Sequence, residues 1–124
     1  MHIMPVSNTN FKGGIVELKK INPKELHSYE AVQKIAEARD INISIAPYTR
    51  SKHFLQDAIY TVTVEKALPR KAGERFDKNK IASAYSYAEI SKKACSEEAS
   101  VKIYNAVINA IENLERKFPR KIKY

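Results

Sequence analysis

Two stretches of the chain show the residue pattern of β-strands. In 41–46, isoleucines alternate with Asn42, Ser44 and Ala46, which is typical of a strand with one buried face. In 58–66 nearly every residue is β-branched or aromatic. These two strands are predicted to pair as a long hairpin, and the β-branched run 15–21 predicts another strand.

Apolar residues at spacings of three and four predict two helices. The first is predicted over about 23–39, with Asn22 as its cap and Pro23 in its first turn. The second begins at Ser96, taken as its cap, and ends before Pro119. Its predicted apolar stripe consists of Val101, Tyr104, Val107, Ile108, Ile111, Leu114 and Phe118.

The segment 81–94 fits two interpretations. Residues 81–87 alternate as a strand would, whereas Glu89 and Lys93 are spaced as a helical ion pair. We favour a strand up to Tyr87 followed by a helical turn. The resulting order, β-α-β-β-(β)-α, predicts a two-layer, single-domain α+β fold with a small, mostly antiparallel sheet and two main helices. This domain is expected over 13–118, between a flexible N-terminal segment (1–12) and a basic C-terminal tail (119–124).

Composition narrows the classes of function. The chain of 124 residues is 44% hydrophobic and 29% charged, which is typical of one globular domain. Its single cysteine, Cys95, excludes an internal disulfide, and no signal peptide or membrane-length apolar run is present, so a cytoplasmic location without membrane contact is expected. His2, His27, His53 and Cys95 lack metal-ligand spacing, and no catalytic or nucleotide-binding motif occurs. We therefore expect a non-enzymatic protein without cofactor or metal, in which Cys95 is either a packing residue or a reactive thiol.

Positive charge is concentrated in three segments. The formal net charge is +8, and the basic residues gather in 11–24, 66–80 and 116–124. Clustered lysine and arginine are the expected footprint of a protein that neutralises phosphates. Aromatic residues are interleaved with the basic residues, and aromatic side chains can stack on bases. The predicted nucleic-acid-binding residues, for RNA or DNA, are Arg50, Lys52, His53, Phe54, Arg70, Lys71, Arg75, Phe76, Tyr87, Lys92 and Lys93.

One short motif resembles a known family. The element order over 23–118, with Ser91-Lys92-Lys93-Ala94 before the last helix, resembles a double-stranded-RNA-binding domain. In that family a lysine-rich element at this position grips phosphates, so the resemblance implies phosphate contacts for Lys92 and Lys93. The sequence departs from the family's pattern at 95–98, where Glu97 and Glu98 follow instead of a further lysine.

Other classes of function remain open from the sequence. A small basic domain without catalytic residues is also typical of an inhibitor or adaptor that meets an acidic protein partner. A small phosphorylated ligand held by the basic loops is a further alternative. A homodimer is also plausible, because the strand 58–66 is apolar on both faces and would need a cover if it lay at a sheet edge.

Overall fold

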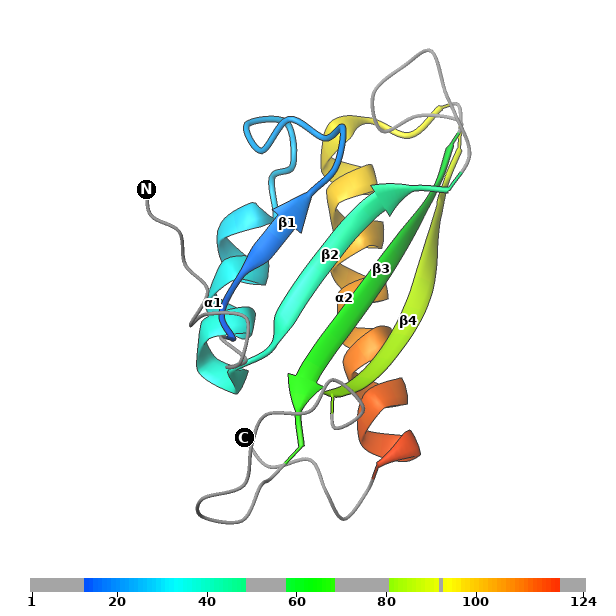
Figure 1. Ribbon diagram of the computed structural model, residues 1–124. Helices are drawn as coiled ribbons and strands as arrows, with labels where there is room; N and C mark the ends of the chain where they lie inside the picture. Colours follow the sequence, from blue (N-terminus) through cyan, green and yellow to red (C-terminus); the bar gives the residue numbers. More distant parts are fainter. Residues whose placement is uncertain (1–12, 49–57, 69–80, 92, 119–124) are drawn as a thin grey trace.

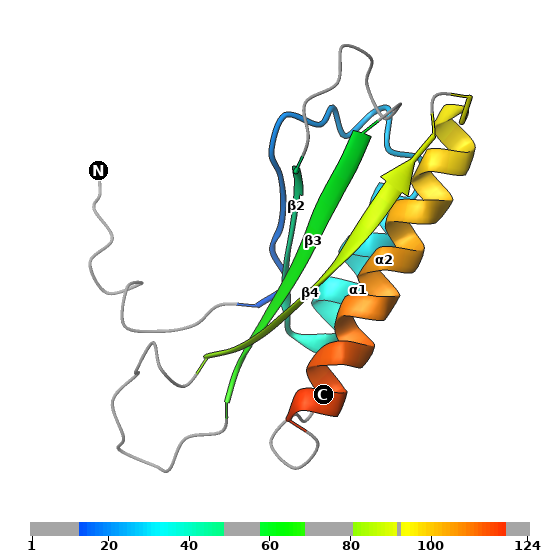
Figure 2. The ribbon, with the colours of Figure 1, turned by 90° about the vertical axis from the view of Figure 1, so that its right-hand side faces the viewer.

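The computed structural model describes residues 13–48, 58–68, 81–91 and 93–118, and the backbone but not the side chain of Ala58. In this part of the chain a four-stranded sheet has two helices on one of its faces (Figures 1 and 2). The elements are β1 (Val16–Leu18), α1 (Tyr29–Arg39), β2 (Asn42–Pro47), β3 (Ala58–Ala67), β4 (Ile81–Ile90) and α2 (Ser96–Lys117). The two-layer α+β fold and the predicted element order are confirmed.

The strands lie in the order β1-β2-β3-β4, so chain order and spatial order coincide. β1 runs parallel to β2, whereas β2 pairs antiparallel with β3, and β3 with β4. The predicted hairpin is thus confirmed, and β3 lies inside the sheet rather than at an edge. The segment 81–94 is a strand through Ile90, beyond the predicted end at Tyr87, and a turn follows in which the Ala94 N–H donates to the Ser91 carbonyl at 3.2 Å.

The core lies between the sheet and the helices. On β2 the isoleucines point inward as predicted, and on β3 every second side chain does so; Ile43, Ile45, Val62 and Val64 are almost wholly buried. On β4 the inward positions are mostly small, with buried Ala82, Ala84 and Ala88 on the side that faces α2. α2 contributes a buried stripe of Ala99, Ser100, Ile103, Ala106, Val107, Ala110, Ile111 and Leu114.

The predicted stripe of α2 was wrong at its N-terminal end. Val101 is 57% exposed, whereas Ile103 is fully buried. The helix turns the face that carries Ala99, Ala106 and Ala110 toward the sheet, because small residues allow the helix axis to approach the strands closely.

Both predicted helix caps were also wrong. The Asn22 side-chain oxygen accepts the Lys24 N–H at 3.0 Å, and the Asn22 carbonyl accepts the Glu25 N–H, so this segment forms turns and α1 begins only at Tyr29. Cys95, not Ser96, is the N-cap of α2, and its side chain makes no capping hydrogen bond. The apolar residue Leu26 is nevertheless buried, so the pre-helical segment packs as the helical interpretation required.

A lysine completes the C-terminal end of α1. The helix ends at Arg39 and is capped by Asp40, whose φ of 54° is left-handed, and the Ile41 N–H donates to the Ala36 carbonyl. The Lys66 ammonium donates to the Arg39 carbonyl at 2.9 Å and to the Asp40 carbonyl at 3.4 Å. Lys66 is only 7% exposed, so its charge serves the helix end and is not part of an exposed basic surface.

Candidate nucleic-acid interface

The sheet face opposite the helices is covered by no described segment (Figure 2). The residues that alternate with the core positions point to this open face. Across β2, β3 and β4 they form three register rows, Asn42–Glu65–Ser83, Ser44–Thr63–Tyr85 and Ala46–Thr61–Tyr87. These side chains do not pack in the core. Core packing therefore does not determine their residue types, which can instead suit contact with a partner.

Three tyrosines gather on the open face, from the residue after β2 to the middle of β4. The Tyr87 ring lies 5.7 Å from the Tyr48 ring and 5.6 Å from the Tyr85 ring, measured between ring centroids, with interplanar angles of 70° and 76°. Tyr48, Tyr85 and Tyr87 are 67%, 58% and 51% exposed, respectively. Tyrosine is enriched at protein interfaces, and a contiguous group of exposed aromatic side chains is a candidate binding surface. We call these three residues the tyrosine cluster.

The tyrosine cluster spans three strands. Tyr48 follows the end of β2, and its N–H donates to the Ile59 carbonyl of β3 at 2.7 Å. Tyr85 and Tyr87 are two residues apart on β4, so they point to the same face. On β3, the half-buried hydroxyl residues Thr61 and Thr63 are the cross-strand neighbours of Tyr87 and Tyr85. The cluster therefore borders small hydroxyl side chains on β3.

The described part of the open face is acidic. It carries Glu17, Glu65 and Glu89, and the one basic side chain that the structure describes there is Lys19. Lys19 pairs with Glu17 at 3.8 Å in a solvent-exposed ion pair. Positive charge that contacts a polyanion must therefore come from the surroundings of this face and not from its centre.

The sequence-predicted site residues divide into those the structure describes and those it does not. Tyr87 lies in the tyrosine cluster, and Lys93 is exposed in the turn before α2. The remaining predicted residues lie outside the described residues, namely Arg50, Lys52, His53, Phe54, Arg70, Lys71, Arg75, Phe76 and Lys92.

The fold separates the segments that hold the predicted nucleic-acid-binding residues. Residues 49–57 join β2 to β3, directly after Tyr48, and residues 69–80 follow the far end of β3. β3 has ten residues, so these two segments are attached about 30 Å apart. The turn with Lys93 follows β4 at the end of the sheet where Tyr48 lies. The predicted site is thus one long region rather than a single patch.

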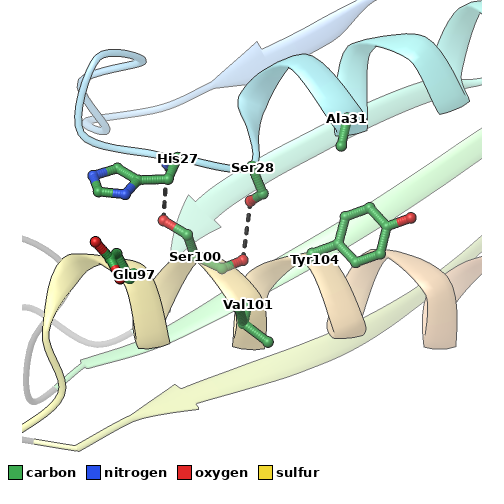
Figure 3. Close-up of a pocket in the computed structure, with 7 residues that line it drawn as sticks. All are labelled: His27, Ser28, Ala31, Glu97, Ser100, Val101 and Tyr104. Atoms are coloured by element: carbon green, nitrogen blue, oxygen red, sulfur yellow. Dashed lines mark hydrogen bonds between the residues drawn. The ribbon is translucent and has the colours of Figure 1, made fainter.

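A hollow of about 350 Å³ lies on the other side of the molecule, between the N-terminal parts of the two helices (Figure 3). Ala31, Val101 and Tyr104 give it apolar walls, and His27 and Glu97 lie at one end. The Ser100 hydroxyl accepts the His27 N–H at 2.9 Å, and the Ser28 hydroxyl donates to the Ser100 carbonyl at 2.9 Å. These two hydrogen bonds join the start of α1 to α2, so the serines of the hollow serve the fold.

Other kinds of site find no support in the described residues. They contain no group of three or more His, Cys, Asp or Glu side chains placed to hold a metal ion. Cys95 is an exposed free thiol at the start of α2. None of the helices in the described part has the length and apolar character needed to cross a membrane.

Sequence reasoning missed Tyr48 and Tyr85 as site residues. Tyr85 carried a usable signal, because the alternation in 81–87 places it on the same face as Tyr87. Tyr48 carried no such signal, because its position beside Tyr87 depends on the register across β3.

Comparison with protein-family models, curated proteins and solved structures found no match for the chain.

Proposed function

We propose that the protein is a small basic module that binds nucleic acid, RNA or DNA. The tyrosine cluster on the open sheet face is the observation that carries this proposal. Exposed aromatic rings on a sheet are a recurring platform for nucleobases, since every base offers a π-face.

The distribution of charge supports the same function. The segment 49–57, which holds the predicted contacts Arg50 and Lys52, and the basic segment 69–80 are attached at opposite ends of β3, with the open face between them. A polyanion that contacts both segments would cross the open face along the strands. Phosphates would then meet lysine and arginine at the two ends, and bases would meet the tyrosine cluster between them.

Fluorescence anisotropy with labelled single-stranded RNA, double-stranded RNA and duplex DNA tests the proposal. We expect sub-micromolar binding to at least one form, retained in part when salt is raised from about 50 mM to about 200 mM. Weak binding to all three forms that vanishes at the higher salt would refute the proposal and favour an acidic protein partner.

Charge reversal tests the contribution of the basic segment 69–80. The double variant Arg70→Glu/Lys71→Glu is expected to weaken binding and to reduce the salt slope by about 1 to 2. Lys34→Glu/Lys102→Glu is the matched control, because it changes the net charge equally at exposed positions on the two helices. Equal losses in both variants would mean that only the overall charge matters, and not this segment.

A further inference from the structure

We infer that the open sheet face receives unpaired bases of a single nucleic-acid strand, and that a duplex is excluded from it. This inference rests on the proposed function and specifies its substrate class. It follows from two independent features of the face, its ring geometry and its charge.

The ring geometry suits bases that are free of a partner. In the tyrosine cluster the neighbouring rings meet edge to face, and each remains at least half exposed. A base can stack on such a ring only if its own face is accessible, and in a duplex both faces of an internal base are covered by its neighbours. The cluster is therefore useful to a strand whose bases are splayed out.

The charge of the face disfavours a duplex. A duplex presents its phosphates on the outside, so phosphates would reach the sheet first. The described open face meets them with Glu17, Glu65 and Glu89 and a single lysine, Lys19, that is already paired with Glu17. A single strand avoids this repulsion, because it can turn its bases toward the sheet and keep its phosphates away from the carboxylates.

The surface beside the rings supplies polar contacts for base edges. Thr63 lies between Ser44 and Tyr85 in the register, and Thr61 is the cross-strand neighbour of Tyr87. A hydroxyl both donates and accepts hydrogen bonds, so these side chains tolerate the edge of any base. We therefore expect binding with little sequence preference.

Binding of a single strand is measured by anisotropy and by intrinsic fluorescence. The probes are a labelled 12-nucleotide oligouridine, the matching oligodeoxythymidine and a 12-base-pair duplex. The chain has no tryptophan and seven tyrosines, so stacking on the cluster is visible as quenching of tyrosine emission. We expect quenching by the single strands and no quenching by the duplex.

Variants of the tyrosine cluster connect the binding to the rings. Tyr85→Ala/Tyr87→Ala is expected to weaken single-strand binding by about 5- to 150-fold for each base that loses its stacking partner. Tyr85→Phe/Tyr87→Phe keeps the rings and is expected to retain the affinity within a few-fold. Circular dichroism checks that the alanine variant is folded, which is expected because both side chains point away from the core.

The outcomes separate the inference from the proposed function. Duplex binding as tight as single-strand binding, or an alanine variant that binds single strands like the wild type, would overturn the inference while nucleic-acid binding stands. Failure of every nucleic acid to bind would overturn the proposed function, and the inference with it.

Discussion

Lys66 offers a sharp test of how a buried charge supports this fold. Its ammonium lies at the C-terminal end of α1 and donates to the Arg39 and Asp40 carbonyls at 2.9 and 3.4 Å. The substitution Lys66→Met keeps an unbranched apolar stem of similar length but removes the charge and the donors. The carbonyl of Arg39 then loses its charged partner at a site with little access to water.

The expected loss of stability follows from the two effects of the ammonium. A hydrogen bond from a charged donor contributes about 1.5–3 kcal/mol, and a cation at a helix C-terminus adds about 0.3–1 kcal/mol. Relief from burying the ammonium opposes these losses. We expect a net decrease of about 2 kcal/mol in the free energy of unfolding, which corresponds to a fall in Tm of roughly 5–10 °C.

Urea denaturation followed by circular dichroism at the helix signal measures this change. Lys102→Met is the matched control, because it makes the same substitution at an exposed position of α2 and is expected to change stability by about 0.5 kcal/mol or less. If Lys66→Met were as stable as Lys102→Met, the hydrogen bonds of the ammonium would only balance its burial, and the reasoning would be refuted.

Two further substitutions test the packing. Gly13→Ala is expected to cost about 1–3 kcal/mol in a thermal melt, since a Cβ there would lie 2.6 Å from the Asp40 carbonyl oxygen; a wild-type Tm would show that this contact relaxes freely. Ile103→Ala is expected to cost about 2–5 kcal/mol in urea denaturation, and Val101→Ala about 0.5 kcal/mol or less, because Ile103 is fully buried and Val101 is exposed. A reversed order of these two would contradict the orientation of α2.

The architecture was predictable because its signals are local. Alternation marked β2, a run of β-branched and aromatic residues marked β3, and regular apolar spacing marked α2, so the order of elements followed directly. The face of α2 was less predictable, because the buried alanines Ala106 and Ala110 carry a weaker signal than the exposed Val101. The predicted start of α1 was wrong because an Asn side chain such as that of Asn22 can accept a backbone N–H in a turn as readily as at the start of a helix.

The sequence position of Lys66 indicates a buried side chain, but counting charges along the chain did not take this position into account. It continues the alternation of Tyr60, Val62 and Val64, so its position predicts a side chain on the buried face. Counting it with the basic segment 66–80 ignored this parity. The candidate site was predictable only in part, since Tyr87 was identified from sequence while Tyr48 became its neighbour through pairing across β3.

The alternation of small and large residues in β4 also protects its own register. Ala84 and Ala88 face α2, while Tyr85 and Tyr87 face solvent. A shift of one residue against β3 would exchange the two sets and press tyrosine rings into space that is shaped for methyl groups. Misregistered folding is therefore penalised by volume as well as by polarity. Tyr85 and Tyr87, which we assign to binding, thus also favour the correct register of β4 against β3 during folding.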